Sequence, residues 1–124
     1  MLSPLNWYKP VTHDNYGEWR EYLKLKLLKK RHFRSDWSGK KITESTGAHM
    51  HEGIVTRANV PRNVEWFWMI FDERNSLLLL PEEHIPQPPP REWCTERLYK
   101  LYGREIVRHW FYNLPWKTVP FELP

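Results

Sequence analysis

Three histidines and one glutamate lie in two short segments whose residue types could together bind a divalent metal ion. His49, His51 and Glu52 are close together in the first segment, and His84 follows a run of four leucines in the second. Imidazole nitrogens and carboxylate oxygens are ligands of Zn²⁺, Mn²⁺ and related ions. Residues two apart in a strand point to the same face, so His49 and His51 share a face that Glu52 does not, unless the strand twists or bulges at Gly53. The two histidines can supply two metal ligands, or one ligand and one general base.

The flanking residues predict two strands and a short helix that would bring these side chains together. Residues 49–57 begin polar and end apolar, as a short strand can, and residues 76–80 are rich in leucine, as expected for a strand buried on both faces. Pro81 suits the first position of a helix, and the two glutamates after it suit the positive helix end. His84 is therefore expected in the first turn of that helix, facing back toward the first strand.

Three further helices are expected around this centre, which makes the fold class α+β. Apolar residues recur at three- and four-residue intervals within residues 15–34, which predicts an amphipathic helix with a basic outer face. Residues 35–47 predict a turn, with a small hairpin at Ser38 and Gly39. Four prolines within residues 86–90 end the short helix, and two more helices are expected over residues 91–113, separated at Gly103. Residues 1–124 are expected to form a single domain.

The charge is concentrated in one part of the chain. The formal net charge is +4, yet residues 20–41 contain nine Lys or Arg and only two acidic residues, whereas acids outnumber bases elsewhere. A segregated basic segment is typical of proteins that bind a polyanion such as DNA, although a solvated basic helix would give the same pattern. The candidate nucleic-acid-binding residues in this segment are Lys24, Lys26, Lys29, Lys30, Arg31, Arg34, Lys40 and Lys41.

The remaining composition narrows the class of protein. The single cysteine, Cys94, excludes an internal disulfide and a zinc ribbon, and it favours a reducing compartment. The longest apolar runs, residues 66–71 and 77–80, are too short to cross a bilayer, and the first residues lack an apolar signal core. A soluble intracellular protein with no membrane partner is expected. Most of the eight tryptophans should lie in the core, and some could stack on nucleobases, although the sequence does not identify which.

Residues 45–86 resemble the HNH, or ββα-metal, nuclease family. The pattern is His51-Glu52-Gly-Ile-Val-x-Arg, then Asn75, a leucine strand, and His84 nine positions after the asparagine. In that family the first strand carries two adjacent functional residues. The first, Asp or His, binds metal, and the second, usually histidine, is the general base. The asparagine braces the loop, and the helix histidine binds the metal. Residues 102–117 are also similar to a tail found in short phage and bacterial HNH proteins.

The sequence departs from the family pattern at three places. Leu80 and Glu83 stand where many relatives carry zinc-ribbon cysteines, so this chain lacks the structural zinc site of those relatives. Pro88 occupies the position of an additional helix ligand, so a metal would need water, substrate phosphate or His49 to complete its coordination. Glu52 stands where the family usually has the histidine base.

Two assignments of the site residues follow from the last departure, and the sequence does not choose between them. Either Glu52 is the base and His51 is a metal ligand, or His51 is the base and His49 is the ligand. His51, Asn75 and His84 are needed in both.

The resemblance implies a metal-dependent DNA endonuclease of a bacterial or phage-infected cytoplasm. Mg²⁺ or Mn²⁺ is the expected ion, with Ni²⁺ or Zn²⁺ as alternatives, and it would stabilise the leaving oxygen while the base activates water. Arg57, at the end of the first strand, could contact phosphate in a bidentate manner. One rival function is a non-catalytic nucleic-acid-binding module of the same shape, acting as partner of a larger nuclease or of phage packaging proteins. A nuclease that acts on RNA is a second rival.

Overall fold

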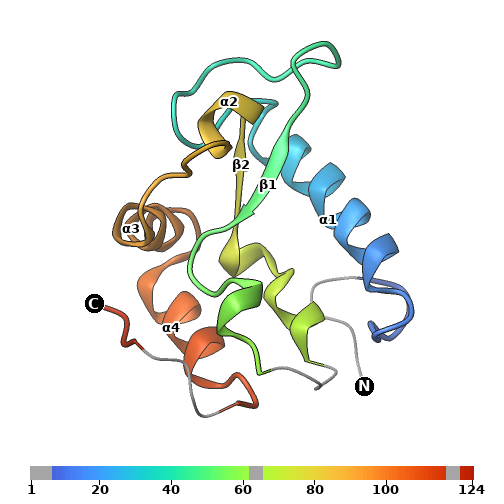
Figure 1. Cartoon of the computed structure of the whole chain (residues 1–124), viewed down its shortest axis with the longest axis vertical. Helices are drawn as coiled ribbons and strands as arrows, with labels where there is room; N and C mark the ends of the chain where they lie inside the picture. Colours follow the sequence, from blue (N-terminus) through green and yellow to red (C-terminus); the bar gives the residue numbers. More distant parts are fainter. Residues whose placement is uncertain (1–6, 62–65, 117–120) are drawn as a thin grey trace.

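The computed structural model describes residues 7–61, 66–116 and 121–124, and its architecture is α+β, as predicted (Figure 1). The parts of the predicted domain at residues 1–6, 62–65 and 117–120 lie outside the described residues. The described elements, in chain order, are α1 (Tyr16–Lys30), β1 (His49–Glu52), η1 (Arg57–Asn59), η2 (Phe67–Ile70), η3 (Glu73–Asn75), β2 (Ser76–Leu79), α2 (Pro81–His84), α3 (Arg91–Tyr102) and α4 (Arg104–Tyr112).

β1 and β2 form a two-stranded antiparallel sheet at the centre of the molecule. Met50 pairs with Leu78, and His51 pairs with Leu77. Paired residues point to the same face of a sheet, so His49 and His51 share a face with Leu77 and Leu79, while Met50 and Leu78 occupy the other. All four residues of β2 are buried, as predicted for a strand covered on both sides.

The first strand is shorter than predicted, because beyond residue 52 its backbone bonds to the side chain of Asn75 and not to a neighbouring strand. The sequence predicts a strand over residues 49–57, but β1 ends at Glu52. The backbone N–H groups of Ile54 and Val55 both donate to Oδ1 of Asn75, at 2.9 Å each. These donors are therefore satisfied by an amide from a distant part of the chain, and no strand pairing is needed there.

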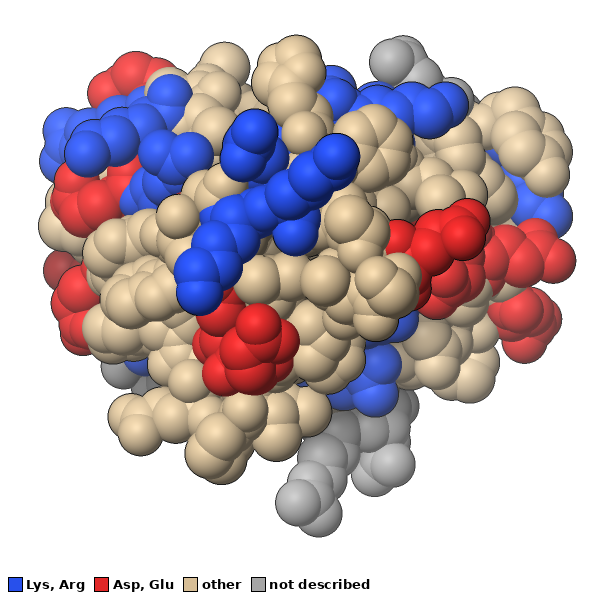
Figure 2. All heavy atoms as spheres, turned by 90° about the horizontal axis from the view of Figure 1, so that it is seen from above, with Lys and Arg blue, Asp and Glu red and all other residues tan. Residues whose placement is uncertain are grey.

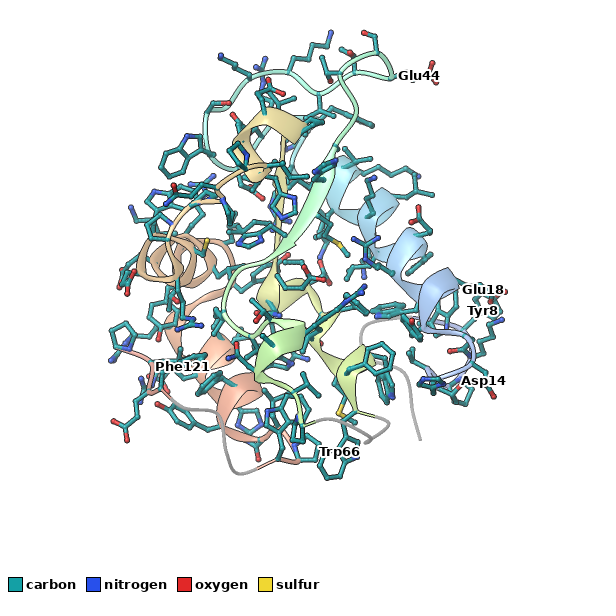
Figure 3. All side chains as sticks on the ribbon, viewed as in Figure 1. Tyr8, Asp14, Glu18, Glu44, Trp66 and Phe121 are labelled. Atoms are coloured by element: carbon teal, nitrogen blue, oxygen red, sulfur yellow. The ribbon has the colours of Figure 1, made fainter. Side chains whose placement is uncertain are left out.

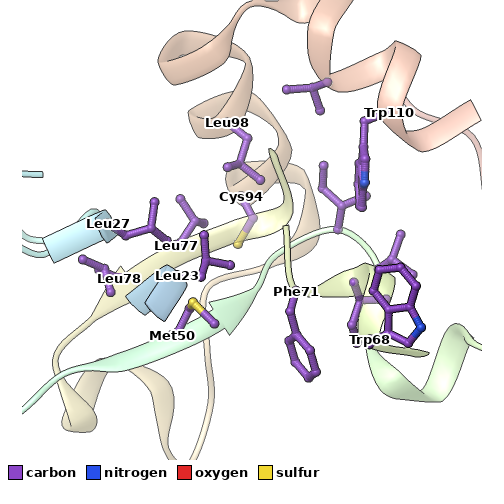
Figure 4. Packing of buried hydrophobic residues seen from close by; sticks show 14 of the residues in the cluster. Leu23, Leu27, Met50, Trp68, Phe71, Leu77, Leu78, Cys94, Leu98 and Trp110 are labelled. Carbon is purple, nitrogen blue, oxygen red and sulfur yellow. The ribbon is translucent and has the colours of Figure 1, made fainter. Parts of the chain in front are cut away.

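The long helix α1 covers the sheet through its predicted apolar stripe. Trp19, Leu23 and Leu27 are fully buried, and Figure 4 shows the two leucines close to the sheet residues. The helix ends at Lys30, short of the predicted residue 34, because His32 and Phe33 adopt left-handed φ angles of 55° and 56°. Such angles cannot continue a right-handed helix.

The segments with ambiguous patterns resolve into turns. Residues 66–71 could form a strand or a helical turn by their sequence, and they contain the short 3₁₀ helix η2. Arg34 and Lys41 form an isolated antiparallel bridge, which confirms a small hairpin around residues 38 and 39. The two C-terminal helices predicted within residues 91–113 are present as α3 and α4, separated at Gly103, whose φ is +95°. None of the described helices is long and apolar enough to cross a membrane.

Helix α3 packs closely against the segment that follows β1. A Cβ at Gly53 would lie 2.8 Å from Cβ of Cys94 and 3.3 Å from a methyl group of Leu77. Only a residue without a side chain fits between the sheet and this helix without displacing backbone or core groups.

We therefore expect Gly53→Ala to lower the free energy of unfolding by about 1–3 kcal/mol, the usual effect of overpacking a core. Gly17→Ala is the matched control, because a Cβ at Gly17 meets no atom within 4 Å and alanine favours the helix. Urea unfolding followed by circular dichroism would measure both. Equal stability of the two variants would show that the packing at Gly53 is not tight.

Candidate functional site

Three histidines from β1 and α2 meet on one side of the sheet, as the sequence predicts. Nδ1 of His49 lies 3.0 Å from Nδ1 of His84. The ring of His51 lies beside that of His84, with 5.0 Å between the ring centroids. His84 reaches this position because α2 begins at Pro81, directly after β2, and its single turn packs on both strands. In Figure 3, Glu44 marks the tip of the loop that leads into β1.

The surroundings keep two of these histidines neutral near pH 7. Burial, followed by the neighbouring His84, lowers the pKa of His51 from 6.5 to about 4. Burial, followed by His49 and Arg20, lowers the pKa of His84. A neutral imidazole has a ring nitrogen with a free lone pair, which is the form that binds a metal or accepts a proton.

The lowered pKa of His51 makes the stability of the fold depend on pH. As pH falls below 6.5, the unfolded chain protonates this histidine first, and the folded chain does so only near pH 4. The free energy of unfolding should therefore decrease as pH falls from about 6.5 to about 4. We expect His51→Gln to flatten this decrease in urea titrations at several pH values. An unchanged slope in His51→Gln would contradict the buried neutral state.

The His49–His84 pair is compatible with a shared metal ion. Two nitrogens that each lie about 2.1 Å from one ion, at roughly a right angle, are about 3.0 Å apart, which matches their separation. The same distance also suits an N–H···N hydrogen bond between the rings. Within the described ranges, no group of three or more His, Cys, Asp or Glu side chains is arranged to hold an ion. The pair would therefore supply two ligands, with water or substrate phosphate supplying the others.

Glu52 lies on the opposite face of β1 and sits in a positively charged corner. Burial raises the pKa of its carboxyl group, and Arg20 and Arg57 partly oppose that rise. Both arginines stand close to the ring of Phe71, with 5.6 Å and 5.4 Å between guanidinium carbon and ring centroid. Nε of Arg20 is buried and has no hydrogen-bond partner among the described residues.

Arg20 is a residue of this corner that the sequence does not predict. It borders the buried stripe of α1, because it follows Trp19 directly and precedes Leu23 by three positions. That helical position is the one signal that could have placed it toward the sheet, and no local pattern connects it with Glu52.

Asn75 braces the backbone on which the first strand ends. Its side chain is fully buried and makes four hydrogen bonds. Oδ1 accepts from the N–H groups of Ile54 and Val55, and Nδ2 donates to the carbonyl oxygens of Val55 and Ile70. Asn75 therefore fixes the backbone that follows β1 to the turn that precedes β2.

The predicted basic residues separate into two groups. The side chain of Arg31 is only 6% exposed and pairs with Asp36, and Lys26 and Lys30 pair with the buried carboxylate of Glu73. These three cations stabilise the fold, and we leave Arg31 out of the proposed nucleic-acid surface. The other candidates in the segment are exposed or half-buried, and they are Lys24, Lys29, Arg34, Lys40 and Lys41.

Comparison with known proteins yields no match: no protein-family model, curated protein or solved structure is similar to this chain.

Proposed function

We propose that this protein is a metal-dependent nuclease of the HNH type that hydrolyses phosphodiester bonds, with DNA as its substrate. The observation that carries the proposal is the contact between His49 and His84, with His51 beside them. The order of strand, strand and short helix, with Asn75 bracing the end of the first strand, supports a ββα-metal centre. Neutral imidazoles on two elements are the expected ligands of such a centre.

His49 and His84 would hold the ion, with Mg²⁺ or Mn²⁺ as the first candidates and Ni²⁺ or Zn²⁺ as alternatives. The bound ion would supply positive charge that stabilises the scissile phosphate and the leaving oxygen. His51 stands beside the pair with its imidazole neutral, so a ring nitrogen can accept the proton of an attacking water.

The strand geometry supports His51, rather than Glu52, as the general base. Alternation along β1 directs Glu52 away from the face that carries His49 and His84. Glu52 instead lies near Arg20 and Arg57, which could bind phosphate next to the reacting group.

Cleavage of supercoiled plasmid tests the proposal. The purified protein would be incubated with Mg²⁺, Mn²⁺, Ni²⁺, Zn²⁺ or EDTA, and the nicked and linear products would be quantified on gels. The proposal predicts nicking or linearisation that requires a divalent ion and stops in EDTA. Absence of cleavage with every ion would reject it, and cleavage of RNA alone would reject DNA as the substrate.

The second candidate function is a nucleic-acid-binding module without catalysis. The observation that favours it is the lack, among the described residues, of a third protein ligand beside the histidine pair. Such a module would act with a larger nuclease or with phage packaging proteins. Salt-sensitive DNA binding in the absence of any metal-dependent cleavage would identify it.

A further inference from the structure

The hairpin between α1 and β1 presents an exposed tryptophan at its tip. Trp37 lies within the turn closed by the Arg34–Lys41 bridge, and 49% of its surface is exposed. Its ring contacts Trp93 of α3, with 4.7 Å between the ring centroids and 67° between the ring planes. A large aromatic side chain that is half exposed and supported from one side offers an apolar surface to a ligand.

The residues that precede Trp37 are anchored to the sheet by hydrogen bonds. The N–H of Asp36 donates to the carbonyl of Leu78 at 2.8 Å, and the N–H of Leu78 donates to the Asp36 carboxylate at 2.7 Å. Arg31 also donates to that carboxylate, at 3.1 Å. Ser35 Oγ accepts hydrogen bonds from the N–H groups of Trp37 and Ser38. The position of Trp37 is thus fixed before any ligand binds, which lowers the entropy lost on binding.

Cations and the histidine site both lie near this tip. Arg34, Lys40 and Lys41 belong to the same hairpin and are exposed. Figure 2, a view onto the end of the molecule that carries α2, shows Lys and Arg side chains gathered across this face, interrupted by acidic groups. Ser35 of the hairpin hydrogen-bonds Glu83, the neighbour of His84 in α2. The hairpin and the histidines therefore contact the same single helical turn.

We propose that Trp37 is a stacking platform for an unpaired nucleobase, with Arg34, Lys40 and Lys41 binding the adjacent phosphates. The ligand class is single-stranded nucleic acid, or a junction that contains unpaired bases. Any base can stack on an indole ring, and nearby cations that follow the backbone complete a single-strand site. This inference rests on the proposed nuclease function and extends it by naming the form of its substrate.

A paired duplex does not fit the same site. The faces of paired bases are covered by their neighbours in the stack, so an indole can reach one only after it leaves the helix. The phosphates of a duplex remain accessible to Lys40 and Lys41, so weaker, purely electrostatic duplex binding is expected. Base stacking and phosphate binding can therefore be separated by experiment.

The test is binding of a fluorescently labelled 12-nucleotide single strand, measured by anisotropy in EDTA at several salt concentrations. We expect Trp37→Ala to weaken binding about tenfold or more without changing the salt dependence, and Trp37→Phe to restore most of the affinity. Lys40→Ala should instead reduce the slope of log affinity against log salt by about 0.7 for each phosphate that the variant no longer neutralises. An abasic single strand should bind the wild-type protein and Trp37→Ala equally.

Any of three binding results would overturn the inference: no effect of Trp37→Ala, equal wild-type affinity for duplex and single strand, or equal wild-type affinity for abasic and normal strands. A change in oligomeric state of Trp37→Ala, with DNA binding intact, would instead assign the tryptophan to self-association and would also overturn it. Because no metal is present, the result does not depend on cleavage. Base-dependent binding by a protein that cleaves nothing would support the platform and reject the nuclease.

Discussion

Replacing His84 by alanine should reduce metal-dependent plasmid cleavage by at least about 100-fold. His84 is the residue that contacts both of the other histidines, and it contributes one of the two nitrogens that face each other at 3.0 Å. Removing a residue that only orients a metal ligand already reduces metal affinity or activity by about 10- to 100-fold, so loss of a ligand should have a larger effect. Initial nicking rates at saturating Mn²⁺ would measure the change.

His109→Ala is the matched control for this substitution. His109 lies on α4 and is exposed, so its loss removes an imidazole without touching the site. The control variant should cleave at the wild-type rate. Cleavage by His84→Ala within a few-fold of the wild type would contradict the assignment of His84, provided that both variants remain folded by circular dichroism.

The largest expected effect on stability is that of Asn75→Ala, which should lower the free energy of unfolding by about 3–5 kcal/mol. The substitution removes an amide that makes four buried hydrogen bonds and leaves the N–H groups of Ile54 and Val55 without their acceptor. Each buried donor left unsatisfied costs about 1–3 kcal/mol. Urea unfolding at pH 7 would give the difference directly.

Asn59 provides a comparison for the same change in a more exposed turn. Its Oδ1 accepts from the N–H and the hydroxyl of Thr56, and the side chain is half-buried, so water can replace it. We expect Asn59→Ala to cost about 1 kcal/mol or less. Asn75→Asp should fall between the two, because it retains the acceptor oxygen but loses the N–H donors. A cost for Asn75→Ala no larger than that for Asn59→Ala would show that the brace is not needed.

Elements set by local patterns could be predicted from the sequence. The stripe of Trp19, Leu23 and Leu27 identified the buried face of α1 because helical spacing alone decides which residues share a side. The leucine run before Pro81 indicated a buried strand followed by a helix start, and hence the position of His84. The contact between the three histidines followed from these two elements.

Features set by contacts between distant residues could not be predicted. β1 ends at Glu52 because of Asn75, more than twenty positions away in the chain. Lys26 and Lys30 form ion pairs with Glu73, over forty positions away, so the number of basic residues in the sequence overstates the number of unpaired cations. No local pattern contains such information, because each depends on which side chains the fold brings together.

The proposal of His51 over Glu52 as the general base also rests on the three-dimensional arrangement. Both residues have suitable chemistry, and they are adjacent in the chain. The regular register of β1 with β2 through residue 52 excludes a bulge within the strand, so the two side chains point to opposite faces. The position of His84, on the His51 side, is the observation on which the proposed role of His51 rests.

A metal ion held by His49 and His84, with His51 beside it, is the feature on which the proposed catalysis depends, and titration with Mn²⁺ tests it most directly. The chain has six histidines, and the other three lie before α1, after α1 and in α4, so they serve as internal controls. Substoichiometric Mn²⁺ should broaden the ring-proton NMR signals of His49, His51 and His84, and leave those of His13, His32 and His109 sharp. Uniform broadening of all six, or no broadening at the three site histidines, would contradict a metal centre at this site.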